Sequence, residues 1–187
     1  MLPILGGPSL DAGRVNAILA AYGSPLRGHG GEFAALSRRY RVDDAIALAF
    51  FVMESRAGTR GEALYTHNIG NLRPASGSGA ADTYQSYGSW MEGAAAWFRL
   101  MREVYVNTLK LNTVEAAVPV YAPSSDANDP TGMTAGIRQL VECWRGKAVA
   151  CPNDPPGVSA LVTAAPGRDE PVRAVAVLTS EHNPESR

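Results

Sequence analysis

A single carboxylic acid, Glu54, stands at the end of the most apolar stretch of the chain. Residues 45–53 are nine consecutive apolar side chains, and Glu54 follows them directly. A run this apolar is expected to be buried, so Glu54 is expected where a buried element reaches a surface or a cleft. Burial raises the pKa of a carboxyl, and the carbonyl end of a helix acts in the same direction. Such a group can serve as a general acid near neutral pH; the alternative is an ordinary helix-end glutamate that reaches water.

Three aromatic residues, Tyr84, Tyr87 and Trp90, lie close together further along the chain. Aromatic rings offer flat apolar faces to sugar rings and polar edges to hydroxyl groups. Such a cluster can line a cleft, although Trp90 fits a core position equally well. Ser55 and Thr59, which follow the acid, are expected to be structural, because no base is placed to activate them as nucleophiles.

Helices must position these groups, and the spacing of apolar residues predicts five or six of them. Helix starts are expected at Asp43, at Ser89 and at Asp129, which precedes a proline. The Gly- and Ser-rich stretch 68–88 predicts a loop with an irregular β-hairpin just after the acid. Helices with a short β element are one way to build a sugar-binding groove. We expect the helices over 12–22, 32–40, 44–57, 90–106, a short stretch after Thr113, and 130–145.

Four motifs in this order make the chain resemble a known family. They are Glu54-Ser-Arg-Ala-Gly-Thr59, Asn68-Ile-Gly-Asn71, Tyr84-Gln-Ser-Tyr87-Gly-Ser89, and Tyr121-Ala-Pro followed by Asp126, Asn128 and Asp129. Over residues 11–146 this pattern resembles the glucosaminidase family of peptidoglycan hydrolases, within the lysozyme-like superfamily. The chain departs from the family pattern at Ala127, where an Asn is common, and in a small hairpin tip at 75–81.

The resemblance implies a mainly α fold of the lysozyme-like α+β type: a helical bundle around a buried central helix, with a small β-hairpin flanking a substrate groove. It implies cleavage of β-1,4 bonds in bacterial cell-wall glycan by an endo-β-N-acetylglucosaminidase, without metal or cofactor. Glu54 matches the catalytic acid. Asp82 is the candidate second catalytic group, with Glu62 or the N-acetyl group of the substrate as alternatives. The candidate substrate-binding residues are Tyr84, Tyr87, Tyr121, Asn71 and Trp90, and turn chemistry also favours hydrogen bonds from Asn68 and Asn71 to the hairpin base.

Two other functions stay open at this point. A lytic transglycosylase also uses one glutamate, but Asn68-Ile-Gly-Asn71 occupies the place of its usual Gly-Leu-Met-Gln-type motif. A non-catalytic lysozyme-like module would bind glycan without cleaving it, and the presence of Glu54 argues against that interpretation.

Composition bounds the partners and the setting. Lys and Arg total 17 against 18 Asp and Glu, which indicates no nucleic-acid surface, and no apolar stretch approaches bilayer length. We expect residues 1–10 to form an N-terminal extension, 11–151 the domain, and 152–187 a Pro- and Gly-rich tail or linker. Cys143 and Cys151 form either a short disulfide or two free thiols. A monomer acting outside the cell or at the wall is expected; the N-terminus lacks the basic region of a signal peptide, as in a phage lysin or a trimmed chain.

Overall fold

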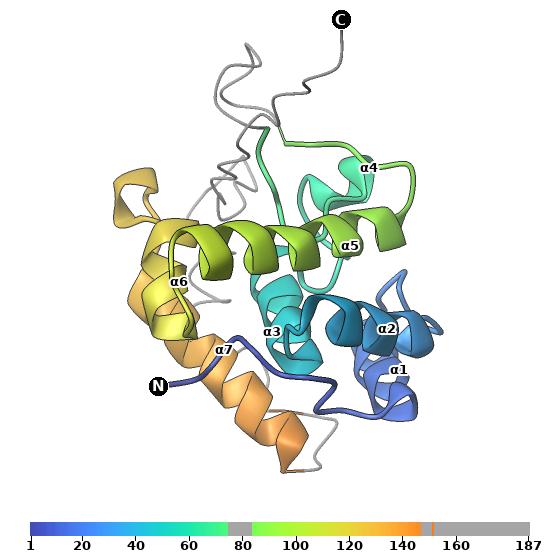
Figure 1. The fold of residues 1–187 in the computed structure, drawn as a ribbon. Coiled ribbons are helices and arrows are strands. Elements are labelled where there is room, and N and C mark those ends of the chain that lie inside the picture. The colour runs from blue at the N-terminus through green and yellow to red at the C-terminus, as the bar shows by residue number, and fades with distance from the viewer. Residues whose placement is uncertain (75–83, 147–150, 152–187) are drawn as a thin grey trace, which may run out of the picture.

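The fold is a set of helices gathered around one buried helix, α3. The computed structural model describes residues 1–74, 84–146 and 151. In Figure 1, α3 lies at the centre, α5 crosses above it, α6 and α7 lie on one side, and α1 and α2 on the other. The helices are α1 (Ala12–Ala21), α2 (Gly30–Tyr40), α3 (Asp44–Ser55), α4 (Ala63–Thr66), α5 (Trp90–Leu100), α6 (Val114–Tyr121) and α7 (Pro130–Arg145), with η1 (Met101–Thr108) and η2 (Ser124–Asp126).

The expected mainly helical fold is confirmed, whereas the expected β-hairpin is not found in the described part of the chain. There, antiparallel pairing is limited to isolated bridges, such as those of Pro3 with Thr113 and of Leu5 with Val42. At the base of the expected hairpin, the Gln85 N–H donates to the Leu72 carbonyl (2.9 Å). The tip of the expected hairpin, residues 75–83, lies outside the described residues.

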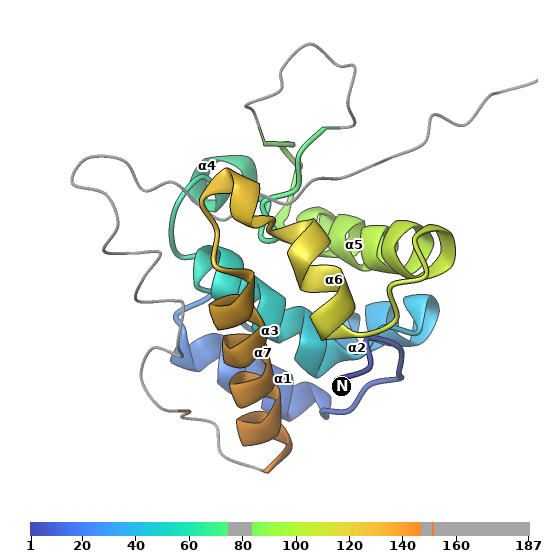
Figure 2. The ribbon, with the colours of Figure 1, turned by 90° about the vertical axis from the view of Figure 1, so that its left-hand side faces the viewer.

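Helix α3 is central because it has no polar face. All twelve of its residues are buried, as expected for a helix that is apolar on every side. The Asp43 side chain caps it as predicted, accepting hydrogen bonds from the N–H groups of Ala45 (2.9 Å) and Ile46 (3.3 Å). The other oxygen of Asp43 pairs with Arg145 in the last turn of α7 (2.7 Å). This contact at opposite helix ends makes α3 and α7 antiparallel neighbours (Figure 2).

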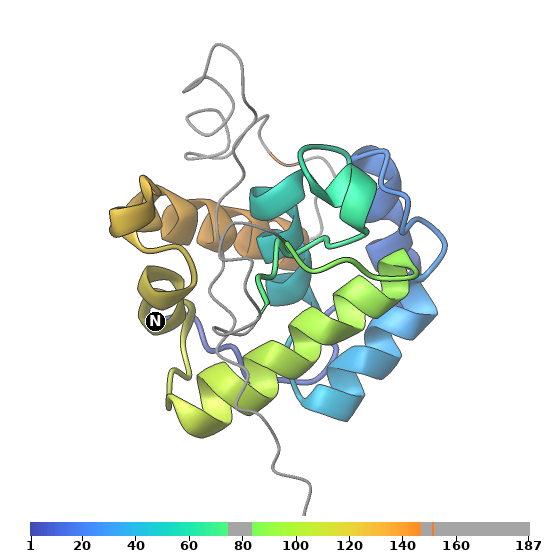
Figure 3. The ribbon, with the colours of Figure 1, turned by 90° about the horizontal axis from the view of Figure 1, so that it is seen from above.

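The long helix predicted over 90–106 forms in two parts. Ser89 caps α5 as predicted, and after Leu100 the chain continues as the π-helix η1 with wider turns. Three consecutive residues of η1, Val104, Tyr105 and Val106, are buried. Figure 3 shows this long helix crossing the bundle, with α7 and the α1–α2 pair on opposite sides of α3.

The first residues of the chain belong to the core of the domain. Leu2 is 7 % exposed and Ile4 is fully buried, and both join the same apolar cluster as α3. The Ile4 N–H donates to the Asn112 carbonyl (2.9 Å), and the Ile4 carbonyl accepts from the Asp43 N–H (3.0 Å). The segment expected as an extension therefore ties the start of α3 to the chain before α6.

The two cysteines form a disulfide. Cys143, in the last turn of α7, is bonded to Cys151, with their Cα atoms 5.9 Å apart. This resolves the choice that the sequence left open between a bridge and two free thiols. The tail expected over 152–187 lies outside the described residues.

Candidate active site

Glu54 lies in the last turn of α3 with its carboxyl enclosed by protein. The side chain is 5 % exposed, and its Oε2 accepts a hydrogen bond from Asn71 Nδ2 (3.0 Å). Burial raises the pKa of Glu54 well above the ordinary value, and the Asn71 bond opposes this rise with a smaller effect. Within the described residues, neither Glu54 Oε1 nor Asn71 Oδ1 has a hydrogen-bond partner. The arrangement favours the neutral carboxylic acid, which is a proton donor, over the carboxylate.

The turn Asn68–Asn71 faces Glu54 and is anchored at each of its residues. Asn68 donates from Nδ2 to the carbonyls of Leu72 (2.7 Å) and Gln85 (2.9 Å), so it holds both sides of the predicted hairpin base, as turn chemistry suggested. The Ile69 carbonyl accepts from Ser55 Oγ (2.9 Å). The last residue, Asn71, donates from the same Nδ2 to the backbone carbonyl of Glu54 (2.9 Å) and to its carboxyl. Asn71 therefore contacts the candidate acid directly.

The chain leaves α3 through three residues in left-handed conformation, Arg56 (φ 50°), Ala57 (φ 57°) and Gly58 (φ 84°). Such a run reverses the chain sharply, and a side chain at Gly58 would come 2.8 Å from the Trp90 ring. Ser55 accepts the Gly58 N–H on its Oγ (2.9 Å), which agrees with the structural role expected for this serine. The reversal leads the chain back towards Glu54 at the Asn68–Asn71 turn.

Two buried tyrosines lie near the Glu54 carboxyl. Burial raises the pKa of Tyr121 well above the ordinary value, and the Glu54 charge adds to the rise. Burial likewise raises the pKa of Tyr105, and Glu54 again contributes. Tyr121 is fully enclosed, so the structure places this candidate substrate-binding residue inside the protein. Tyr105 was not among the residues expected at the site, although it continues the helical spacing of Trp97 and Met101.

The aromatic candidates at the expected hairpin exit are partly buried. The Tyr87 hydroxyl donates to Gln85 Oε1 (2.5 Å), and burial raises the pKa of Tyr87 to about 12. The Trp90 ring lies 5.1 Å from the ring of His67, and Tyr84 is half-buried. The candidate second catalytic residue, Asp82, lies outside the described residues.

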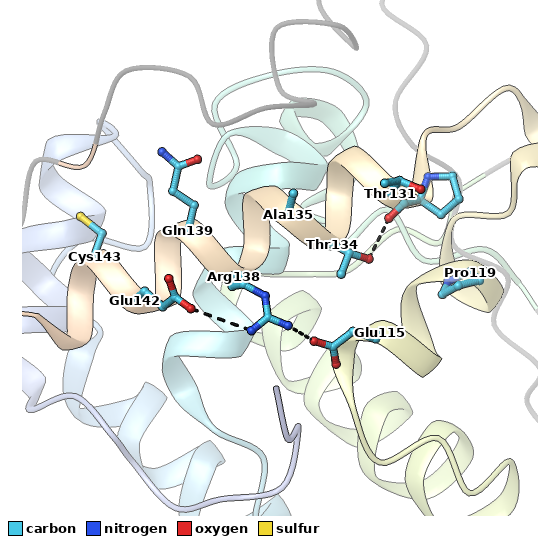
Figure 4. A pocket seen from close by; sticks show the side chains of 10 residues that line it. Glu115, Pro119, Thr131, Thr134, Ala135, Arg138, Gln139, Glu142 and Cys143 are labelled. Atoms are coloured by element: carbon cyan, nitrogen blue, oxygen red, sulfur yellow. Dashed lines mark hydrogen bonds and ion pairs between the residues drawn. The ribbon is translucent and has the colours of Figure 1, made fainter. Parts of the chain in front are cut away.

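An open groove lies apart from Glu54, between α6 and α7 (Figure 4). It has a volume of about 760 Å³. Arg138 crosses its floor, paired with Glu115 on α6 and with Glu142 one turn further along α7 (3.9 Å). The lining residues are Glu115, Pro119, Pro130, Thr131, Thr134, Ala135, Arg138, Gln139, Glu142 and Cys143. None of the sequence-predicted site residues lines this groove.

Among the described residues, no group of three or more His, Cys, Asp or Glu side chains could hold a metal ion. No described helix combines the length and apolar character needed to cross a bilayer. No protein-family model matches the chain, and no curated protein matches its sequence.

Proposed function

We propose that the protein is a peptidoglycan hydrolase, an endo-β-N-acetylglucosaminidase in which Glu54 is the general acid. The observation that carries the proposal is the state of this carboxyl: it is 5 % exposed at the end of a buried helix, and burial raises its pKa. A glycosidase needs a carboxylic acid that stays protonated until it transfers its proton to the leaving oxygen.

Contacts between the motifs support the same interpretation. Residues that are far apart in sequence meet around one group: Asn71 of the second motif hydrogen-bonds Glu54 of the first. Tyr121 of the fourth motif donates to the Gly70 carbonyl of the second (2.5 Å). Such contacts are expected if the motifs form one constellation rather than four unrelated matches.

In the proposed reaction, the Glu54 proton moves to the glycosidic oxygen as the bond from that oxygen to the anomeric carbon breaks. Positive charge develops on the sugar ring, and water or the substrate's own N-acetyl group attacks the anomeric carbon. Asp82 is the proposed base or charge-stabilising group. Tyr84, Tyr87 and Trp90, which follow the Asn68–Asn71 turn in the chain, are the proposed contacts to sugar rings. The expected partner is wall glycan, met outside the cell by a monomer.

Turbidity loss of purified cell walls, followed by mass analysis of the released fragments, tests this proposal. We expect wild-type protein to clear the walls and to release reducing N-acetylglucosamine ends. Glu54→Gln keeps the shape of the side chain but removes the acid, so its rate is expected to fall by about a hundred- to ten-thousandfold. Glu103→Gln is the matched control, because Glu103 is an exposed residue of η1, and its rate is expected to stay at the wild-type level.

Other outcomes would replace the proposal. Anhydro-sugar ends would identify a lytic transglycosylase. If the wild type and Glu54→Gln bind walls equally and neither releases fragments, the protein is a non-catalytic glycan-binding module.

A further inference from the structure

The Tyr121 hydroxyl is buried and makes two hydrogen bonds to other protein groups. It donates its one proton to the Gly70 carbonyl (2.5 Å) and accepts a hydrogen bond from Trp97 Nε1 (3.1 Å). Its ring packs against the rings of Phe50 (5.1 Å) and Tyr105 (5.9 Å). Because a hydroxyl has a single proton to donate, Tyr121 in this arrangement has none left for a sugar hydroxyl or a glycosidic oxygen.

Tyr121 hydrogen-bonds the Gly70 carbonyl, and the next residue, Asn71, hydrogen-bonds Glu54. Gly70 precedes Asn71, which is 1 % exposed and has a left-handed backbone (φ 49°). The Asn71 amide nitrogen donates to the Glu54 backbone carbonyl (2.9 Å) and to its Oε2 (3.0 Å). One donor atom thus fixes the carboxyl relative to its own backbone, and the position of that donor depends on the peptide between residues 70 and 71.

Space around Gly70 leaves this peptide little freedom. A Cβ on Gly70 would come 2.4 Å from Cδ1 of Trp97 and 3.3 Å from the Tyr121 hydroxyl. The backbone at Gly70 is therefore in direct contact with both members of the Trp97–Tyr121 pair. A shift of Tyr121 has to be passed to the turn, because close-packed neighbours transmit displacement.

We propose that Tyr121 is a positioning residue for Glu54, acting through Gly70 and Asn71, and that it makes no contact with the glycan. This inference rests on the proposed function for its consequence in catalysis, but the positioning chain itself can be tested without activity. The series of contacts runs from Trp97 through Tyr121, Gly70 and Asn71 to the Glu54 carboxyl.

Wall-hydrolysis kinetics of Tyr121→Phe separate the two roles. The substitution keeps the ring and removes only the hydroxyl, so a positioning role predicts a kcat about ten- to a hundredfold lower, with KM within about twofold of wild type. A residue that binds glycan would instead raise KM. Asn71→Ala is expected to reproduce the loss in kcat, and Tyr65→Phe, at a residue that is 82 % exposed, is expected to leave both constants unchanged.

A double-mutant cycle gives the second readout. If Tyr121 acts only through Asn71, the double variant Tyr121→Phe/Asn71→Ala is expected to lose no more kcat than Asn71→Ala alone. If the losses in kcat of the two single variants multiply in the double variant, the proposal is overturned, because Tyr121 then acts by a route that does not pass through Asn71.

Carbon-13 NMR of the labelled Glu54 carboxyl tests this series of contacts in full-length protein without any substrate. Because the Asn71 bond lowers the pKa of Glu54, weakening it is expected to move the titration midpoint upward in both Asn71→Ala and Tyr121→Phe. The Tyr121 ring carbon that bears the hydroxyl is expected to shift with the same midpoint in wild type, a measurement that stands even if a variant folds poorly. The positioning role would be refuted if the Glu54 titration midpoint in folded Tyr121→Phe equals that of the wild type. It would also be refuted if the chemical shift of the Tyr121 ring carbon does not change with pH. A protein that shows the coupling but cleaves no wall would refute only the proposed function.

Discussion

Burial and one amide hydrogen bond act in opposite directions on the Glu54 carboxyl. Burial has the larger effect and raises the pKa of Glu54 well above its ordinary value, while Asn71 opposes it. The folded protein therefore binds a proton at Glu54 that the unfolded chain releases near pH 4.5. Stability from this proton is fully present below the unfolded-state pKa and is lost as pH rises through the folded-state pKa. Ionisation of the buried Glu54 carboxyl thus makes folding less favourable at neutral and alkaline pH.

Glu54→Gln is expected to stabilise the protein more at pH 8 than at pH 4, because glutamine has no proton to lose. The difference amounts to about 1.4 kcal/mol for each pH unit by which the folded-state pKa of Glu54 exceeds the unfolded one. Urea unfolding of the variant and wild type at both pH values measures it. Glu103→Gln, on the exposed side of η1, should show the same difference from wild type at both pH values. Equal effects of Glu54→Gln at the two pH values would mean that the folded-state pKa is not raised.

Helix α5 lies directly against the chain at His67, just before the Asn68–Asn71 turn that contacts Glu54. Gly93 allows this approach: a Cβ there would come 2.1 Å from the His67 carbonyl oxygen, a backbone atom. His67 in turn donates from Nδ1 to the Tyr87 carbonyl (3.0 Å), and the Tyr87 N–H donates to Thr66 (2.8 Å). The residues on either side of the expected hairpin are thus fixed against α5 at its first turns.

Gly93→Ala is expected to destabilise the protein by about 2 to 3 kcal/mol and to lower activity, because α5 must move away from the loop. The matched control is Gly31→Ala in α2, where an added Cβ meets nothing within 4 Å. It is expected to stabilise the protein by about 0.5 to 1 kcal/mol through helix propensity. Chemical denaturation of both variants measures the pair. If the two substitutions change the free energy of unfolding equally, the close approach of α5 to His67 does not limit the size of residue 93.

At the scale of the whole molecule, the N-terminal segment closes the bundle. Ile4 is fully buried, and its backbone bonds join the chain before α6 to the start of α3. The Val114 N–H donates to the Leu2 carbonyl (2.9 Å), and Glu115 accepts the Leu2 N–H. Residues far apart in sequence therefore complete one core, and the first residues contribute to it although they precede every helix.

Ile4→Ala is expected to cost about 2 to 4 kcal/mol of unfolding free energy, because it leaves a cavity beside α3. Leu5→Ala, at a neighbour that is 38 % exposed, is expected to change stability by about 0.5 kcal/mol at most. Denaturant unfolding of the two variants compares them directly. If both cost the same small amount, the segment is an extension outside the cooperative core.

Local signals along the sequence were enough to predict most of the helices. The caps at Asp43, Ser89 and Asp129 all form, since each side chain reaches N–H groups only two or three residues away. The apolar run 45–53 predicted the buried helix, because no amphipathic surface helix has that pattern, and it predicted an acid with a raised pKa at its end. These features depend on neighbours in sequence, and the sequence by itself determined them. The acid was expected where the helix reaches a surface or a cleft, whereas its side chain is buried.

Other features depended on contacts between distant segments. Asn71 reaches Glu54 across 17 positions, and Tyr121 reaches Gly70 across 51. Their residue types suited turns and grooves equally well, so only the tertiary structure assigned Asn71 to the acid and enclosed Tyr121 in the core. The burial of Ile4 has the same origin, because it depends on contacts with distant segments rather than on local preference. The sequence thus pointed to Glu54 as the candidate acid, and tertiary packing decided what surrounds it.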